Sequence, residues 1–294
     1  MNVVTARAWN LRKRLKGDIA VLQEATRLFF AHRANRLSAG LAYYALFALL
    51  PTLLLSVGVA GAFVGREAAA GELADQMSGL VGAEAAETVE SAIASLWTST
   101  NRSSFALVGV LTVVYSSSLL FAAWRDTVEL IWAVPYESGL QRTLSARAFA
   151  VLVPIGAGLL MATMMLLQGF LTAVEGFVGS AILDATLRSV GAVLQTVVGA
   201  VALAVVFRYS ARAIRPEWRD IWPAVVIVVL ILNVGFWGFG LYLRFIGSTS
   251  VTGAASSAFL GLLVVYYSAQ VLLFGAEIVQ VLGRQEPDEE ESDS

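Results

Sequence analysis

Residues 250–284 read SVTGAASSAFLGLLVVYYSAQVLLFGAEIVQVLGR, and this stretch decides the fold class of the chain. Between Ala254 and Leu282 the only charged residue is Glu277. An apolar segment of about 18 residues or more with almost no charge is long enough to cross a bilayer as a helix. The stretch therefore predicts a membrane-spanning helix.

The polar residues of this stretch fall on one side of the predicted helix. At about 100° per residue, Tyr266, Gln270 and Glu277 lie within a stripe about 40° wide. The opposite side is apolar and is expected to face lipid: Val264, Val271, Ile278 and Leu282. Glu277 is either a structural residue that snorkels or pairs with an arginine, or a residue that binds a substrate or ion. For Gln270 the pattern favours a contact between helices over a ligand contact.

Composition points to a polytopic membrane protein. The 294 residues are 57% apolar and 14% charged, and the mean hydropathy is +0.72, whereas soluble domains carry about 25% charged residues. The chain has no cysteine, and His32 is its single histidine, which excludes a thiolate or multi-histidine metal site, and we expect no cofactor. The net charge of −2 leaves no basic excess for binding nucleic acid.

Five further stretches share this apolar character, so we predict an all-α protein with a six-helix transmembrane domain over residues 37–283. The predicted spans are about 37–64, 105–124, 148–171, 189–207, 221–243 and 256–282. Pro51 lies inside the first span and is expected to kink or interrupt it, because proline removes a backbone donor. Gly235 and Gly238 in the fifth span are candidate gating positions.

Three segments flank or interrupt these spans. Residues 1–36 predict a basic amphipathic helix that either lies on the anionic lipid surface or packs on the bundle. Its candidate lipid contacts, each worth about 1 kcal/mol near the surface, are Arg12, Lys13, Arg14 and Lys16. Residues 66–104 alternate acidic and apolar positions, which predicts an amphipathic helical insert outside the bilayer. Residues 284–294 predict a disordered acidic tail.

The distribution of basic residues predicts the orientation of the chain. Sixteen of the twenty Lys and Arg residues lie in the N-terminal segment, the second and fourth connections and the tail, and four lie in the other connections. Because cytoplasmic loops carry the excess of basic residues, we expect both termini in the cytoplasm and the 66–104 insert outside it.

The motif YYSAQVLLFGAE at residues 266–277 is long enough to be specific, and LAYYALFALLP at residues 41–51 accompanies it in the first span. Val81-Gly82, residues 125–132 and Trp218-Arg219-Asp220 fit the same pattern. Over roughly residues 25–283 the chain resembles the YihY/BrkB family of bacterial inner-membrane proteins. The resemblance implies a six-helix protein of the bacterial cytoplasmic membrane.

Three positions depart from the residues common in that family. Glu129 stands where Asn is frequent, Ser210-Ala211 where Leu-Pro is usual, and Thr252 where Tyr is common. Family members are suspected of export or transport, and some carry an old ribonuclease label. We disfavour the ribonuclease interpretation and expect no enzyme, because nucleases commonly need metal-bound water or a histidine base.

The leading functional hypothesis is a transporter or exporter of a small neutral or zwitterionic solute or of a lipid. The residues that are candidates for its polar path are Tyr115, Ser116, Gln195, Asn233, Tyr266, Gln270 and Glu277. The alternative is an envelope scaffold that transports nothing and binds a partner through residues 66–104. A closed bundle without a cavity near Gln270 favours the scaffold, and a cleft that reaches Gln270 and Asn233 favours transport. The expected partners are membrane lipids and an unidentified solute, and no oligomeric state is predicted.

Overall fold

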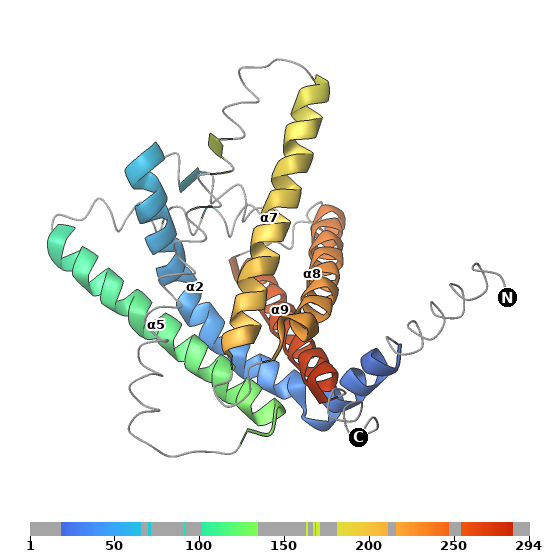
Figure 1. The fold of residues 1–294 in the computed structure, drawn as a ribbon. Coiled ribbons are helices and arrows are strands. Elements are labelled where there is room, and N and C mark those ends of the chain that lie inside the picture. Colours follow the sequence, from blue (N-terminus) through green and yellow to red (C-terminus); the bar gives the residue numbers. More distant parts are fainter. Residues whose placement is uncertain are drawn as a thin grey trace, which may run out of the picture.

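In the computed structural model of the chain, every regular element of the described residues is a helix, which confirms the all-α prediction. The described residues are 19–65, 70–71, 87, 91, 102–134, 163, 167, 169–170, 181–210, 216–246 and 254–284. Five long helices dominate Figure 1: α2 (Ala34–Val64), α5 (Arg102–Ile131), α7 (Ala181–Tyr209), α8 (Trp218–Ile246) and α9 (Ala254–Arg284). A shorter helix over residues 19–31 precedes α2.

Three segments among the described residues are long and apolar enough to cross a membrane: Ser189–Tyr209, Trp218–Tyr242 and Phe259–Arg284. They coincide with the fourth, fifth and sixth predicted spans. The helices α2 and α5 cover the first two predicted spans, and at about 1.5 Å per residue each exceeds the ~30 Å of a hydrocarbon core. The third span lies almost wholly outside the described residues, so the total of six remains a prediction.

Several other predicted features also fall outside the described residues. They are the basic cluster of Arg12, Lys13, Arg14 and Lys16, nearly all of the 66–104 insert, and the acidic tail after Arg284. Pro51 does lie in a described helix, because α2 continues through it from Ala34 to Val64. The predicted alternative of an interruption at Pro51 is therefore wrong. Membrane helices tolerate proline where neighbouring helices re-satisfy the freed carbonyl.

The helix α9 lies at the centre of the described bundle. It packs against α2 on one side and α8 on the other and meets α5 near one end, while α2 also packs on α5, and α7 packs on α8 (Figure 1). The lipid-facing side predicted for α9 is wrong as to its residues, because the exposed large apolar side chains of this helix are Phe259, Leu262 and Leu263 near its start. Val264, Val271 and Ile278 are buried, and Leu282 is partly buried against the core. The second half of α9 has neighbouring helices on several sides, so little of its apolar surface is left to face lipid.

Two glycines allow the central helices to approach closely. A Cβ atom at Gly275 of α9 would overlap the side chain of Val228 and lie 2.8 Å from Phe207 Cζ, so both neighbouring helices need the glycine. A Cβ atom at Gly235 of α8 would overlap the ring of Tyr267, whose hydroxyl donates to the Ile231 carbonyl oxygen at 2.6 Å. Gly238 faces open space. Of the two candidate gating glycines, Gly235 is therefore closely packed, and Gly238 is not.

Apolar side chains line the outer face of α8. Val226, Leu230, Val234 and Trp237 are exposed and recur at spacings of four, four and three residues. This spacing places them on one face of the helix. A continuous exposed apolar stripe on a long helix fits contact with lipid rather than with water.

Candidate functional site

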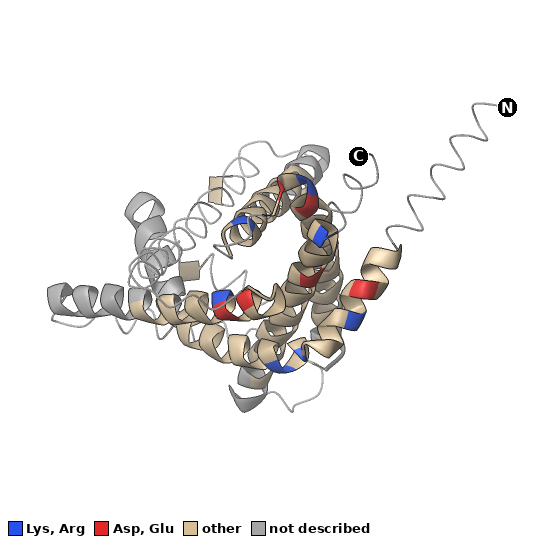
Figure 2. Cartoon of the chain, turned by 60° about the horizontal axis from the view of Figure 1, so that its bottom comes forward, with Lys and Arg blue, Asp and Glu red and all other residues tan. Residues whose placement is uncertain are grey.

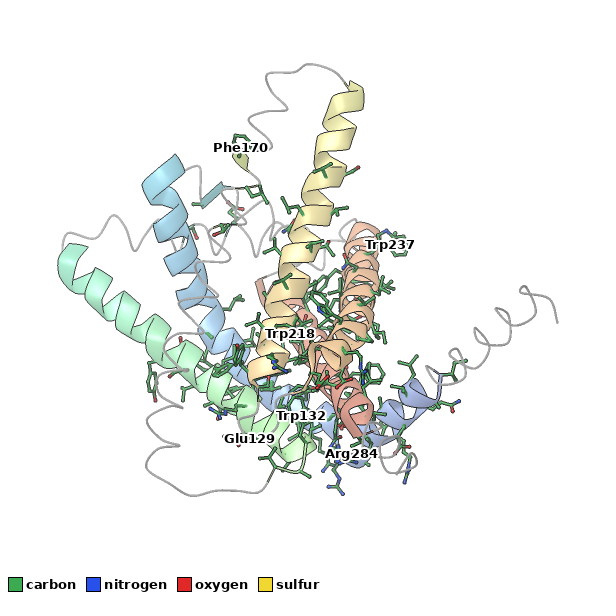
Figure 3. The ribbon with its side chains drawn as sticks, in the orientation of Figure 1. Glu129, Trp132, Phe170, Trp218, Trp237 and Arg284 are labelled. Atoms are coloured by element: carbon green, nitrogen blue, oxygen red, sulfur yellow. The ribbon has the colours of Figure 1, made fainter. Side chains whose placement is uncertain are left out.

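The charged residues of the described helices lie mainly toward one end of the bundle, where Figure 2 colours them on the backbone. At this end α2 and α8 begin and α5, α7 and α9 finish. We call it the charged end, and its residues are Arg36, Arg125, Asp126, Glu129, Arg208, Asp220, Glu277 and Arg284. Figure 3 shows Glu129, Trp132, Trp218 and Arg284 there, whereas Trp237 lies farther along the bundle.

A turn between the 19–31 helix and α2 brings His32 to the central helix. Arg33 has a φ of 53°, and its N–H donates to the Phe30 carbonyl oxygen at 3.1 Å. A residue in the left-handed region is a common end to a helix, and it costs about 1 kcal/mol for a residue other than glycine. The turn positions His32 so that its Nδ1 lies 2.8 Å from Glu277 Oε1.

Glu277 is fully buried in this pair. Its relative side-chain exposure is 0%, that of His32 is 29%, and Glu277 Oε2 has no hydrogen-bond partner among the described residues. Of the interpretations left open by the sequence, snorkelling to the surface is wrong, and within the described part of the chain Glu277 pairs with His32 rather than with an arginine. A buried carboxylate is costly unless it is paired, so the imidazole of His32 is its principal stabilising contact.

The end of α5 is joined to α9 by two polar contacts. Trp132 Nε1 donates to the Ala276 carbonyl oxygen at 3.0 Å, and Gln280 Nε2 donates to the Ile131 carbonyl oxygen at 2.7 Å. Ala133, with a φ of 52°, ends α5 in a Schellman motif. This motif turns the chain after Trp132 and leaves the Ile131 carbonyl free to accept the bond from α9.

Two positions that depart from the family pattern contribute polar contacts at the same end. Glu129 Oε1 accepts from Arg125 Nε at 3.1 Å, and both side chains are nearly buried. Ser210 Oγ accepts from Trp124 Nε1 at 2.8 Å and links α5 to the end of α7. An i, i+4 pair between Arg125 and Glu129 is typical of an exposed helix face, but this pair lies against the bundle core because α5 turns that face inward.

Three buried polar atoms at the charged end have no hydrogen-bond partner among the described residues. They are Arg125 Nη2, Glu277 Oε2 and Gln280 Oε1. Leaving such an atom unsatisfied costs about 1–3 kcal/mol. The second halves of α5 and α9 therefore hold a buried donor and two buried acceptors that no hydrogen bond among the described residues uses.

The connection between α7 and α8 is held by side chains of the charged end. Arg208 lies over the Trp218 ring at 5.5 Å from its centre and donates to the Pro216 carbonyl oxygen. Asp220 is buried in the first turn of α8, where a carboxylate interacts favourably with the positive end of the helix dipole. These contacts fix where α8 starts relative to α7.

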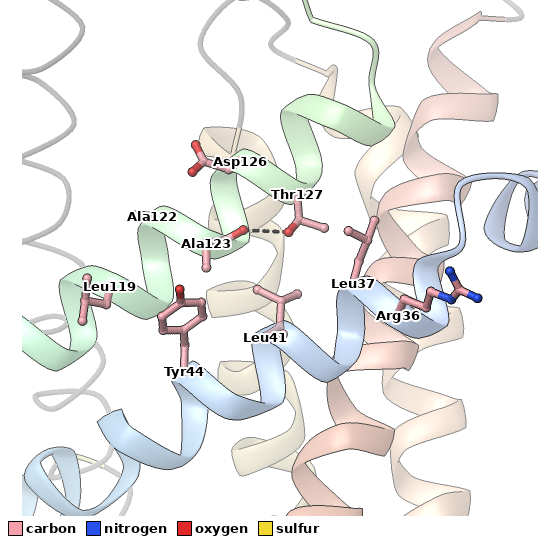
Figure 4. Close-up of a pocket in the computed structure, with 10 residues that line it drawn as sticks. Arg36, Leu37, Leu41, Tyr44, Leu119, Ala122, Ala123, Asp126 and Thr127 are labelled. Carbon is pink, nitrogen blue, oxygen red and sulfur yellow. Dashed lines mark hydrogen bonds between the residues drawn. The ribbon is translucent and has the colours of Figure 1, made fainter.

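A groove lies between α2 and α5, and its volume is about 490 Å³. Its lining consists of Arg36, Leu37, Gly40, Leu41 and Tyr44 from α2 and Leu119, Ala122, Ala123, Asp126 and Thr127 from α5. In Figure 4, Leu37, Leu41 and Tyr44 rise from α2 toward α5. Arg36 and Asp126 extend away from the space between the helices, so both charges stand at the rim (Figure 4). We call this space the α2–α5 groove.

Four of the candidate path residues lie on three helices, α5, α7 and α8, and differ in their exposure. Tyr115 and Asn233 are exposed, and Asn233 donates to the Val229 carbonyl oxygen of its own helix at 2.8 Å. Ser116 is buried, and Gln195 is partly buried on α7. None of these four residues lines the α2–α5 groove.

Two residues of the polar stripe predicted on α9 contact the same neighbouring segment. Tyr266 donates to the Asn35 carbonyl oxygen at 3.2 Å, and Glu277 pairs with His32, so both contact the chain around the start of α2. Gln270 lies between them, is partly buried and makes no hydrogen bond among the described residues. The groove lining includes neither Gln270 nor Asn233, so the cleft expected for transport is not the α2–α5 groove.

Sequence reasoning missed His32, Gln280 and the charged rim of the groove. Gln280 follows Glu277 by one helical turn, and that spacing in an apolar span was a usable signal. Arg36 directly precedes one charge-free run, and Asp126 follows another after Arg125, so both stand close to the end of a run. The start of α2 and the end of α5 lie at the same end of the bundle because the two helices pack antiparallel. The sequence of either run alone does not predict this packing.

Comparison with known proteins agrees with this helical membrane architecture. The chain is 27% identical over 276 residues to a UPF0761 membrane protein of Rhodospirillum centenum, and the match covers 92% of this chain and 59% of that relative. No solved structure matches the chain. The family described as Virulence factor BrkB matches residues 25–294, which include the described helices from residue 25 onward. The chain is thus a membrane protein that belongs to the BrkB virulence factor family.

Proposed function

We propose that this protein moves a small neutral or zwitterionic solute, or a lipid, across the bacterial cytoplasmic membrane. The observation that carries the proposal is the α2–α5 groove, a different site from the cleft expected near Gln270 and Asn233. It has charges of both signs at its rim and mainly apolar side chains along its wall. Such a lining suits a molecule with a polar head that has no net charge. Its volume of about 490 Å³ falls within the range of about 300–1,000 Å³ that is typical of ligand pockets.

The position of the groove supports the same proposal. Arg36 and Asp126 lie at the ends of charge-free runs, so they mark the level at which these helices leave the hydrocarbon. The lining then continues along α2 to Tyr44, which is eight residues or about 12 Å deeper. With the charged end in the cytoplasm, as the distribution of basic residues predicts, the groove is entered from the cytoplasmic side.

A flux measurement with a filled groove tests this function. Gly40 lines the groove, and a Cβ atom there meets nothing within 4 Å, so Gly40→Leu fills the space without a clash on the backbone side. Gly199→Leu on α7 is the matched control, because that position is also open and lies outside the groove lining. Both changes replace a helical glycine, so both also raise helix propensity by a similar amount.

The assay uses proteoliposomes with labelled zwitterionic solutes and headgroup-labelled lipids. We expect wild type and Gly199→Leu to move at least one of them faster than empty liposomes, and Gly40→Leu to reduce that rate at least fivefold. Equal rates in empty and wild-type liposomes would exclude transport of the molecules tested and favour the scaffold alternative. Equal rates for the two leucine variants would exclude the groove as the path.

A further inference from the structure

The buried side of α9 carries two oxygen atoms that lack a hydrogen-bond donor. Glu277 is 0% exposed and Gln280 is 8% exposed, and neither Glu277 Oε2 nor Gln280 Oε1 has a hydrogen-bond partner among the described residues. The two residues are three positions apart on one helix, which makes their side chains neighbours with Cβ atoms about 5–6 Å apart. Both oxygens are acceptors, so neither satisfies the other, and a donor is what this part of the helix lacks.

The other polar atoms of the two side chains are already held. Glu277 Oε1 lies 2.8 Å from His32 Nδ1, and Gln280 Nε2 donates to the Ile131 carbonyl oxygen at 2.7 Å. The orientation of an amide is judged from its hydrogen bonds. Turning the amide of Gln280 over gives Glu277 a donor but sets Gln280 Oε1 against the Ile131 carbonyl oxygen, which is also an acceptor. The missing donor therefore does not come from Gln280.

A proton on the carboxyl group supplies that donor. We propose that Glu277 and Gln280 form a proton-binding site, in which Glu277 Oε2 carries the proton and donates it in a hydrogen bond to Gln280 Oε1. A carboxylic acid has one O–H donor, whereas a carboxylate only accepts. Glu277 Oε1 still accepts from His32, so one chain of hydrogen bonds runs from His32 through Glu277 and Gln280 to the end of α5. A buried polar network is favourable when all of its members are satisfied in this way.

His32 is the member of the chain that water reaches, since its side chain is 29% exposed whereas that of Glu277 is not exposed at all. A proton therefore passes between water and Glu277 on the His32 side. Loading takes one proton from water and forms the O–H bond of Glu277, and release returns the proton to water. No other covalent bond forms or breaks.

The charges around Glu277 leave it free to take up a proton. Within the described part of the chain, the charged or titratable groups that act on Glu277 are His32 and Arg284, and those of α2, α5 and α8 are not among them. Arg284 is exposed and lies seven residues, or about 10 Å, farther along α9. An arginine in direct contact holds a carboxylate in its charged form. The imidazole of His32 does not, because its neutral ring still donates from Nδ1.

Infrared difference spectroscopy of the full chain in detergent, recorded as a function of pH, measures the loading. A protonated carboxyl group has a carbonyl band that a carboxylate lacks, so we expect a band in wild type that Glu277→Gln removes. Glu129→Gln is the matched control, because Glu129 is also a nearly buried glutamate at the charged end but pairs with Arg125. We expect this control to keep the band.

A second variant tests the acceptor. Gln280→Met keeps the length of the side chain and removes its oxygen, so the carbonyl band is expected to move to a higher frequency. Half-loading is expected to need at least a threefold higher proton concentration, because the O–H has lost its hydrogen bond. A far-ultraviolet circular dichroism spectrum equal to that of wild type shows that the variant is folded.

Nitrogen NMR of histidine-labelled protein reports on the other end of the chain of hydrogen bonds. His32 is the single histidine of the sequence, so one imidazole gives all of the signal. At half-loading we expect a neutral ring with its proton on Nδ1. This measurement does not depend on the Gln280 variant.

Three results overturn the inference. The absence of a band that depends on Glu277 at every pH means that a bridging water or another donor fills the site. A charged imidazole without a carboxyl band places the proton on His32 instead. A band with the same frequency and pH dependence in folded Gln280→Met removes Gln280 as the acceptor.

The proton site stands on these contacts, and only its role in transport rests on the proposed function. A carrier with such a site at its cytoplasmic end couples the movement of its solute to the proton gradient. A Glu277 band without flux in proteoliposomes removes transport and leaves the proton site. Flux that ignores the proton gradient, together with no Glu277 band, removes the proton site and leaves transport.

Discussion

Replacing His32 by alanine is expected to destabilise the whole bundle, because it leaves a buried carboxylate without its partner. Glu277 has 0% side-chain exposure, and His32 Nδ1 at 2.8 Å is its only hydrogen-bond partner among the described residues. Removing one member of a buried pair typically costs about 3–5 kcal/mol. Because the His32 side chain is 29% exposed and water can reach the vacated space, we expect the lower limit, about 3 kcal/mol. At about 2–4 °C per kcal/mol, the thermal midpoint falls by roughly 6–12 °C.

A second substitution separates loss of the pair from simple loss of packing. Glu277→Gln removes the buried charge and keeps the size of the side chain, so the double variant His32→Ala/Glu277→Gln is expected to be more stable than His32→Ala alone. If His32 acted only by filling space, Glu277→Gln would give no rescue. Replacing one member of the exposed pair, as in Glu24→Gln, is the control and is expected to change stability by less than about 1 kcal/mol.

Tryptophan fluorescence during heating measures these midpoints in one detergent at one scan rate, since irreversible unfolding makes the midpoint depend on both. A His32→Ala midpoint within 2 °C of wild type would refute the importance of the pair. A double variant no more stable than His32→Ala would refute the buried charge as the cause.

Three further predictions concern packing and orientation. Gly275→Ala places a methyl group against two neighbouring helices and is expected to cost about 1–3 kcal/mol, whereas Gly199→Ala in open space is expected to leave the thermal midpoint unchanged or slightly raised. Trp132→Phe keeps an aromatic ring but removes the indole N–H that donates to α9 and leaves a small void in the core, so we expect a loss of about 1–3 kcal/mol in the same melting assay. Reporter fusions are expected to place residues 66–104 outside the cytoplasm and residues 284–294 inside it, and one shared compartment would contradict the predicted orientation.

The helices could be predicted from the sequence because hydrocarbon imposes a simple rule on the chain. Charge-free runs longer than a bilayer is thick must be helical, since no water satisfies their backbone groups. This rule found α7, α8 and α9 among the described elements, each close to its predicted bounds. The rule did not predict that α9 lies at the centre of the bundle, because the burial of a helix on two sides depends on the helices that pack against it. Ile278 shows the limit: its apolar side chain suits lipid and protein equally, and only packing against other helices buries it.

The polar contacts could be predicted only in part. The stripe of Tyr266, Gln270 and Glu277 follows from the helical repeat alone, and it correctly predicted a common face. The helical repeat did not predict the partner of Glu277, because His32 lies 245 positions away and is brought to Glu277 by a turn at Arg33. Long-range pairs of this kind depend on how helices are arranged, which a periodicity does not encode.

The contacts of α9 also indicate that it is the fixed axis of the described bundle. Polar side chains on several sides of α9 donate hydrogen bonds to neighbouring segments: Tyr266 to Asn35, Tyr267 to Ile231, and Gln280 to the end of α5. Gly275 locks it further against α7 and α8, so any displacement of α9 breaks several contacts together. The helices α2 and α5 pack on each other more extensively than any other pair of described helices, although the α2–α5 groove of about 490 Å³ opens between them. The groove is therefore an opening within a closely packed seam, and the contacts of α9 give it a fixed axial role in the bundle.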